Sequence, residues 1–390
     1  MSYRGHLVKR GGPRCCRPSD TGCQNIGMTP SCIAYFVSSH GFGHAARSAA
    51  VMEAIHGQLP ATRFGLFTGV PRWFFEDSMT APFDYLPSHT DVGLVQSTPM
   101  EEDLSATIRE LSNFLPLRAD AVEKAAERVS RLGCSLVVSD ISPLGIAVAS
   151  ALGLPCVLIE NFTWDWIYGA YLAVEPRFSS FIDELHNLYS TVHLRIQARP
   201  FCQPVSGALS VAPISRPIRQ SRPEILDRLQ LSAGSPFVLL TMGGFPTSYE
   251  FLDRLHRYSD FHFVIPGGAD SFVRQQNLIL LPHRTSFQHA DLVAAASLVV
   301  GKLGYSTLAE VYQAATPYLF MQRRRFPESP ALARFAERNL VCGELTEDEF
   351  KAANWPSRLF EFQEERRPVE AETTGSQEAA DLILDLLENR

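Results

Sequence analysis

Short apolar strands alternate with helices along this chain of 390 residues, and no other feature limits the fold as strongly. In the first series, continuous apolar runs predict strands at 32–37, 63–68, 135–139 and 156–160. Apolar spacing near 3.6 residues predicts helices at 45–56, within 101–132, and at 143–152. Strands that alternate with helices form a parallel sheet with helices on both faces. The first half is therefore predicted to be an open α/β domain.

A second series follows a passage rich in proline and arginine between Arg199 and Pro223. It predicts helices at 224–231 and 306–313, and strands at 237–242, 261–265, 277–281 and 298–301. We expect an α/β fold with two Rossmann-like parallel-sheet domains facing a cleft, the first at 31–205 and the second at 224–365. Residues 206–223 are the expected linker, and the tail at 366–390 holds an amphipathic helix at 378–387.

Composition and charge exclude several classes of protein. The 42 acidic residues outnumber the 35 basic ones, and without a basic stripe a nucleic-acid partner is not expected. No run approaches the roughly 18 apolar residues of a membrane span, and the scattered cysteines are typical of a cytoplasmic protein. Residues 1–30 lack apolar periodicity, so we expect a disordered leader, with Met28 as an alternative start. The cysteines of this leader have no CxxC pair, and we expect neither a metal site nor a cofactor.

The first strand runs into a glycine-rich loop whose Gly41, Gly43 and Ala46 satisfy a loose GxGxxA pattern. Alone, this pattern is a weak indication of dinucleotide binding. The acidic residue expected at the end of the second strand is absent, because Phe67 leads into Thr68 and Gly69. No Walker-type lysine motif occurs either, so neither common nucleotide loop is predicted.

His44 lies where this loop becomes a helix, and Asp140 ends another strand of the same predicted sheet. Both side chains should therefore reach the carboxyl edge of the sheet, where open parallel sheets bind ligands. A carboxylate there can orient a histidine and support its protonated form, which is what a general base requires. The alternative is that each residue only caps the helix that follows it. The pair in one sheet favours catalysis over two separate caps.

An aromatic segment follows the strand at 156–160 and includes Asn161, Trp164, Asp165 and Trp166. Aromatic side chains of this kind commonly pack in a core. Aromatic faces beside asparagine and aspartate also suit a sugar site, because they combine apolar platforms with fixed hydrogen bonds. The sequence does not decide between these two roles.

In the second half, a strand end is followed by Gly304, Ser306, Thr307 and Glu310 at the start of a helix. Free backbone N–H groups and the helix dipole make such a start an anion site that suits a diphosphate. Glu310 lies one turn into the helix and can accept hydrogen bonds from ribose hydroxyls. The alternative is an ordinary capped helix with solvated side chains. A second glycine turn, Gly243-Gly244, ends another strand and offers further backbone donors.

Four motifs together resemble the GT-B glycosyltransferases, especially MurG-type and plant UDP-sugar transferases, over about residues 32–345. The chain looks most like the glycosyltransferase-like N-terminal half of plant L-arabinokinase. The motifs occur in the expected order as His40-Gly41-Phe42-Gly43-His44, Val138-Ser139-Asp140, the aromatic run 161–168, and Gly301-Lys302-Leu303-Gly304-Tyr305-Ser306-Thr307. The resemblance implies that the last helix crosses back to the first domain.

The resemblance also implies roles for individual residues. His44 would be the acceptor base and Asp140 its partner, Gly304, Ser306 and Thr307 would bind the diphosphate, and Glu310 the ribose. The acceptor would then lie near His40, Asn161, Trp164 and Asp165. Where many members carry an Asp-Gln or His-Gln pair for the donor sugar, residues 323–330 read Arg-Arg-Arg-Phe-Pro-Glu-Ser-Pro, and Glu328 is the plausible replacement.

The function implied by this resemblance is sugar transfer from a nucleotide diphosphate sugar, with a UDP-sugar as first choice, to a hydroxyl of a small-molecule, glycan or lipid acceptor. A kinase half has no counterpart here, so arabinose phosphorylation is not predicted. A non-catalytic nucleotide-sugar binding module is the alternative that the altered donor segment keeps open. A nucleotide-sugar epimerase of the same fold has little direct support.

Overall fold

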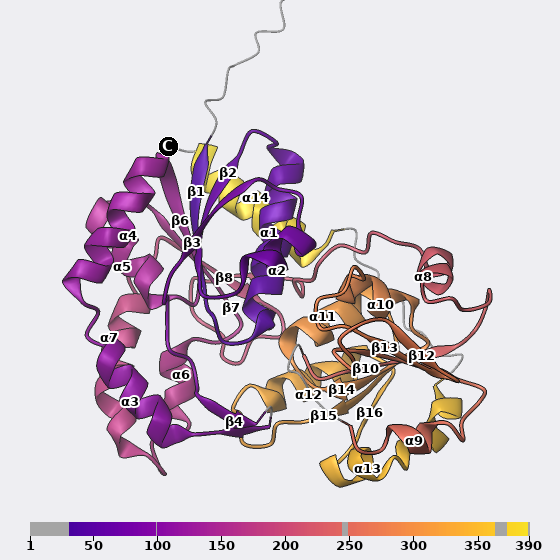
Figure 1. Ribbon diagram of the computed structural model, residues 1–390. Coiled ribbons are helices and arrows are strands. Elements are labelled where there is room, and N and C mark those ends of the chain that lie inside the picture. The colour runs from indigo at the N-terminus through magenta and orange to yellow at the C-terminus, as the bar shows by residue number, and fades with distance from the viewer. Residues whose placement is uncertain (1–30, 99, 244–248, 363–372, 389–390) are drawn as a thin grey trace, which may run out of the picture.

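The computed structural model describes residues 31–98, 100–243, 249–362 and 373–388, so the expected leader 1–30 and Gly244 lie outside the described residues. Two seven-stranded sheets form the two lobes seen in Figure 1. The first sheet has the order β3-β2-β1-β6-β7-β8-β9, and all its strands are parallel. The second has the order β12-β13-β11-β10-β14-β15-β16, with β12 antiparallel. The predicted α/β class with two parallel-sheet domains is confirmed.

The first sheet is built from short buried strands with helices on both faces. Its strands are β1 (Cys32–Val37), β2 (Arg63–Thr68), β3 (Phe83–Pro87), β6 (Cys134–Asp140), β7 (Cys156–Glu160), β8 (Leu194–Ala198) and β9 (Leu209–Val211). Along β1, Ile33 and Tyr35 pack into one hydrophobic cluster, and Ala34 and Phe36 pack into another. Alternate side chains of a strand face opposite sides, so a strand buried on both faces reads as a continuous apolar run.

The helices of the first lobe divide between those two faces. On the side of Ile33 and Tyr35 lie α1 (Phe42–Gln58) and α2 (Arg72–Ser78). On the opposite side lie α3 (Leu104–Phe114), α4 (Ala119–Leu132), α5 (Pro143–Leu152), α6 (Trp164–Gly169) and α7 (Ser179–Tyr189), with the 3-10 turn η1 (Pro176–Phe178). This arrangement leaves the carboxyl ends of the strands free to face the second lobe (Figure 1).

The second lobe repeats the plan. Its strands are β10 (Phe237–Thr241), β11 (His262–Pro266), β12 (Val273–Gln275), β13 (Leu278–Leu281), β14 (Leu298–Lys302), β15 (Tyr318–Met321) and β16 (Cys342–Glu344). Its helices are α8 (Arg222–Arg228), α9 (Leu252–Leu255), α10 (His289–Ala295), α11 (Tyr305–Ala314), α12 (Ser329–Asn339) and α13 (Glu347–Ala352), followed by η2 (Trp355–Glu361). One apolar cluster continues from α1 through α11, so the two lobes share buried surface.

The segment 206–223, expected to be only a linker, contains a strand. Within it, β9 pairs with β8 from Leu209 to Val211, so the first sheet extends beyond residue 205. Prolines at 204 and 213 flank this strand. The linker is expected from the prolines and arginines between Arg199 and Pro223, but proline is compatible with a short strand at the edge of a sheet.

The last helix, α14 (Gly375–Glu388), returns to the first lobe, as the resemblance implied. It packs against α1, and Figure 1 shows the two helices side by side. Ala379, Ala380 and Ile383 are buried there, and Gln58 of α1 donates a hydrogen bond of 2.6 Å to Asp381. The C-terminal segment therefore forms part of the core of the first lobe.

A small hairpin also crosses between the lobes. It consists of β4 (Gln96–Thr98) and β5 (Glu101–Glu102) and projects from the first lobe toward the second (Figure 1). Met100 packs against the core of the second lobe, and Glu102 accepts a hydrogen bond of 2.7 Å from Arg323.

We expect Ile383→Ala to lower the free energy of unfolding by about 2–5 kcal/mol, because it leaves a cavity between α14 and α1. Glu388→Ala, at an exposed position of the same helix, should change it by less than about 0.5 kcal/mol. Urea unfolding of both variants measures the difference. Equal effects would mean that α14 adds no stability to the first lobe.

Candidate active site

A cavity of about 480 Å³ opens between the carboxyl ends of the two sheets. Its wall includes residues from the loops and helix starts after strands of both lobes, namely His40, His44, Asn161, Gly243, Gly304 and Arg323. Open α/β sheets bind ligands at this edge, and the volume is that of a small-molecule site. The predicted cleft is therefore a defined cavity.

His44 is held by the start of α1. The helix begins at Phe42, and its N-cap is Gly41, whose positive φ of 75° favours glycine. His44 is then the third residue of the helix, so it does not cap it. The helix after Asp140 is capped by Ser142, whose hydroxyl accepts a hydrogen bond from the N–H of Gly145. The capping alternatives for His44 and Asp140 are therefore wrong.

His44 and Asp140 meet as the sequence predicted. Nδ1 of His44 lies 2.7 Å from Oδ1 of Asp140, and the carboxylate is fully buried. Arg47, one turn along α1, donates from Nε to Oδ2 at 2.8 Å and from Nη2 to Oδ1 at 2.6 Å. Ser48 donates to Oδ2 at 3.2 Å. A neutral His44 that donates from Nδ1 keeps Nε2 as a proton acceptor.

The charge of Asp140 is stabilised by its neighbours. Burial by itself raises the pKa of Asp140, but Arg47 and His44 lower it to about 2. The carboxylate therefore stays ionised at neutral pH. Sequence analysis missed Arg47, although its spacing of three residues from His44 places both on one face of a helix.

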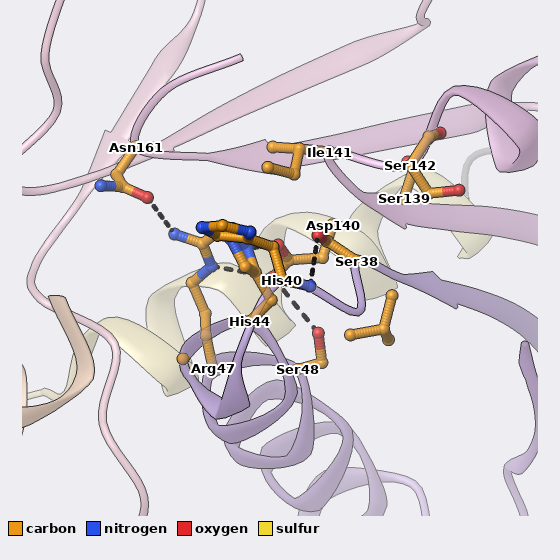
Figure 2. A network of polar contacts seen from close by, with 12 residues as sticks. Ser38, His40, His44, Arg47, Ser48, Ser139, Asp140, Ile141, Ser142 and Asn161 are labelled. Carbon is orange, nitrogen blue, oxygen red and sulfur yellow. Dashed lines mark hydrogen bonds and ion pairs between the residues drawn. The ribbon is translucent and has the colours of Figure 1, made fainter. Parts of the chain in front are cut away.

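Two predicted residues join across the lobes. Asn161 accepts a hydrogen bond of 2.6 Å from Nη1 of Arg47, and Figure 2 shows Arg47 between Asn161 and Asp140. The amide nitrogen of Asn161 donates to Oε1 of Glu328 in the second lobe, also at 2.6 Å. Both side chains line the cavity, and burial raises the pKa of Glu328.

The other residues predicted near the acceptor are placed differently. His40 lines the cavity, and burial together with Arg323 lowers its pKa well below the usual value, so its ring is neutral at physiological pH. Trp164 is 1% exposed, packs in the core and donates from Nε1 to Asp91 at 2.8 Å. Asp165 contacts His186. Trp164 and Asp165 are not among the cavity-lining residues.

The predicted anion site faces the cavity from the second lobe. Gly304 is the N-cap of α11, and Ser306 and Thr307 lie in its first turn. The hydroxyl of Ser306 donates to the carbonyl oxygen of Gly43 at 3.2 Å, so the first turns of α1 and α11 touch. Gly243 has a φ of 70°, and an added Cβ would lie 3.4 Å from Cε of Lys302. Gly243, Gly304, Ser306 and Thr307 all line the cavity.

Lys302 ends β14 beside these elements and was not assigned a role from the sequence. It lines the cavity, and burial and then Arg323 lower its pKa to about 8. Arg323 lines the same wall and lies 4.0 Å above the ring of Phe326. Lys302 lies within the motif Gly301-Lys302-Leu303-Gly304-Tyr305-Ser306-Thr307, so the sequence indicates the position of this lysine but not its burial beside Arg323.

Glu310 lines the cavity and is already paired. Its Oε1 accepts two hydrogen bonds from Arg216, at 3.0 and 2.8 Å, and its Oε2 lies 2.5 Å from Nδ1 of His289. Burial raises the pKa of Glu310, but Arg216 and His289 lower it to about 2. Nε2 of His289 lies 3.0 Å from the hydroxyl of Thr241. A ribose that reached Glu310 would therefore meet an ionised carboxylate whose Oε1 already accepts two hydrogen bonds from Arg216.

Within residues 31–98, 100–243, 249–362 and 373–388, no cluster of three His, Cys, Asp or Glu side chains could hold a metal ion. In the same ranges, none of the helices combines the length and apolar character needed to cross a membrane.

Comparison with known proteins supports the fold. No family model matches the chain. L-arabinokinase of Arabidopsis thaliana is 26% identical over 330 residues, which are 80% of this chain and 31% of that protein, so the chain spans about a third of the length of this curated relative.

Solved glycosyltransferase structures superpose over most of the chain. A UDP-glucosyltransferase from Polygonum tinctorium matches with a TM-score of 0.58 and 13% identity, over 93% of this chain and 99% of that chain. MurG of Acinetobacter baumannii matches with a TM-score of 0.51 and 15% identity, over 91% of this chain and 100% of that chain. The predicted GT-B fold is confirmed.

We expect Arg47→Met to lower the free energy of unfolding by about 3–5 kcal/mol, because it removes the main cation beside a buried carboxylate. Arg63→Met breaks the exposed pair with Asp84 and should cost about 1 kcal/mol or less. Chemical unfolding at neutral pH compares the two variants. Equal costs would show that the buried pair is not what holds Asp140 in place.

Proposed function

We propose that this chain is a glycosyltransferase that moves a sugar from a nucleoside diphosphate donor to a hydroxyl acceptor. The observation that carries the proposal is the His44–Asp140 pair, with Nδ1 and Oδ1 2.7 Å apart, at a cavity faced by the start of α11. A module that only binds a nucleotide sugar has no use for an oriented base. The likeness to L-arabinokinase and to a UDP-glucosyltransferase supports the same class of substrate.

In the proposed reaction His44 is the general base. Its Nε2 takes the proton of the acceptor hydroxyl while that oxygen attacks the anomeric carbon of the donor sugar. The bond between this carbon and the phosphate oxygen breaks, and the nucleoside diphosphate leaves with the electron pair. One direct displacement inverts the anomeric carbon. Asp140 orients the ring and stabilises the imidazolium that forms.

The diphosphate is proposed to bind at the first turn of α11. Backbone N–H groups after Gly304, the hydroxyls of Ser306 and Thr307, and the turn at Gly243 surround one part of the cavity. An anion is stabilised at such a helix start by free N–H groups and the helix dipole. Lys302, which runs beside Gly243, adds a positive charge to this part of the cavity.

The ribose, the donor sugar and the acceptor are proposed to bind in other parts of the same cavity. Glu310, on the same helix, takes the ribose hydroxyls through Oε2, and Glu328 contacts the donor sugar. UDP is the favoured nucleotide. The acceptor is proposed to lie near His40 and Asn161. Trp164 and Asp165 are not proposed to contact the acceptor, because neither side chain lines the cavity. Their proposed role is to support the residues that do.

We expect His44→Ala to lower the turnover number about a hundred- to ten-thousandfold with little change in donor affinity, because it removes only the proton acceptor. Asp140→Asn should be less severe. Transfer assays with UDP-, GDP-, ADP- and dTDP-sugars measure the rate, and calorimetry measures donor affinity. His89→Ala, outside the cavity, is the matched control. A parallel loss of donor binding in His44→Ala would make the residue a phosphate ligand or a structural one.

We also expect the affinity for UDP to fall as pH rises through about 8, because Lys302 loses its charge near that pH. Below this value the lysine is charged before the ligand arrives, and above it binding must take up a proton. Calorimetry in buffers of different ionisation enthalpy measures that proton. Lys302→Gln should remove the pH dependence, whereas Lys351→Gln on the exposed face of α13 should keep it. A wild-type affinity for UDP that is constant from pH 7 to 9 would show that Lys302 does not contribute to binding of the diphosphate.

A further inference from the structure

A continuous set of polar contacts links His44 to the second lobe. It runs from His44 through Asp140, Arg47 and Asn161 to Glu328, with successive contacts of 2.7, 2.6, 2.6 and 2.6 Å. The first four residues belong to the first lobe, and Glu328 directly precedes α12 of the second. All five side chains are buried.

Within this set Arg47 determines where Asp140 lies. The carboxylate of Asp140 accepts four contacts, from His44, from Ser48 and two from Arg47, which fills its usual capacity. Two parallel bonds from a guanidinium fix both the position and the plane of a carboxylate. A change in the position of Arg47 therefore changes where Oδ1 meets His44.

Arg47 is in turn held from outside its own helix. Its Nη1 donates to Asn161, and its guanidinium lies 5.1 Å from the centre of the ring of Tyr305, at the start of α11. Asn161 is only 1% exposed, and its orientation is set by Arg47 on one side and Glu328 on the other. Two of these contacts, with Tyr305 and Glu328, come from the lobe proposed to hold the donor.

We infer that Arg47 and Asn161 are positioning residues that make the orientation of His44 depend on docking of the second lobe. When the lobes separate, Asn161 loses Glu328 and Arg47 loses the ring of Tyr305. Asp140 then still pairs with Arg47, but the plane of its carboxylate is no longer fixed. The base is aligned only when the donor-carrying lobe is in place, which limits proton removal without a donor. This inference rests on the proposed function for its catalytic consequence.

The test uses Asn161→Ala, Glu328→Ala and the double variant. Each single change should lower the turnover number about ten- to a hundredfold, the size expected for a misplaced catalytic group. The affinity for UDP should change less than threefold, because UDP carries no donor sugar for Glu328 to contact. The double variant should lose no more than the worse single variant, because both act through the same contact. Glu337→Ala, on the exposed side of α12, and Asn187→Ala, exposed on α7, are matched controls. Losses that multiply in the double variant, or a loss confined to UDP affinity, would overturn the inference.

A second measurement does not depend on activity. With UDP added, the imidazole ¹⁵N signals of His44 should show one tautomer, protonated at Nδ1, in the wild type and in Glu337→Ala. In Asn161→Ala and Glu328→Ala they should shift toward a mixture of tautomers. Unchanged signals would overturn the inference even if His44→Ala abolishes transfer. A shift in these variants without transfer to any acceptor would support the inference and reject the proposed function.

Discussion

The buried ion pair between Arg47 and Asp140 is the interaction on which the site depends. Asp140 ends a central strand of the first sheet, where a lone carboxylate would be too costly to keep ionised. Arg47 removes that cost through two parallel hydrogen bonds. His44 can then donate to a carboxylate that is already charged and fixed. The local structure around the site follows from this pair, because β1, the loop after it and the start of α1 must bring Arg47 over the end of β6.

The second lobe uses the same combination of groups. Glu310 is buried, accepts two hydrogen bonds from Arg216 and contacts His289, just as Asp140 is shared between Arg47 and His44. In each case an arginine stabilises the charge, and the histidine keeps its other ring nitrogen for another partner. For His289 that partner is the hydroxyl of Thr241. For His44 it is proposed to be the substrate hydroxyl. The two histidines therefore differ in what their second ring nitrogen is expected to meet, a protein hydroxyl for His289 and a substrate in the role proposed for His44.

The central strands could be predicted from the sequence and the edge strands could not. The predicted bounds of β1, β2 and β7 agree with the structure, because strands buried on both faces are continuous apolar runs between turn residues. At the edges, β9 and β16 have three residues each, and β9 lies between prolines. Such strands are defined by the neighbour they pair with, not by their own composition. The first sheet therefore extends into a segment whose local signals were those of a linker.

The candidate site, like the sheets, could be predicted from the sequence only where local patterns determine it. His44, Asp140 and the start of α11 could be located because each lies at the end of a strand or in the loop and helix start after one, and parallel strands bring their carboxyl ends to one edge. The pairing of Asn161 with Glu328 depends on how two lobes pack, and no local pattern encodes it. Trp164 illustrates the opposite case, since an aromatic residue after a strand fits both a ligand platform and a core. Its burial and its hydrogen bond to Asp91 place Trp164 in the core, whereas Asn161 lines the cavity and has an amide that bonds to both lobes at once.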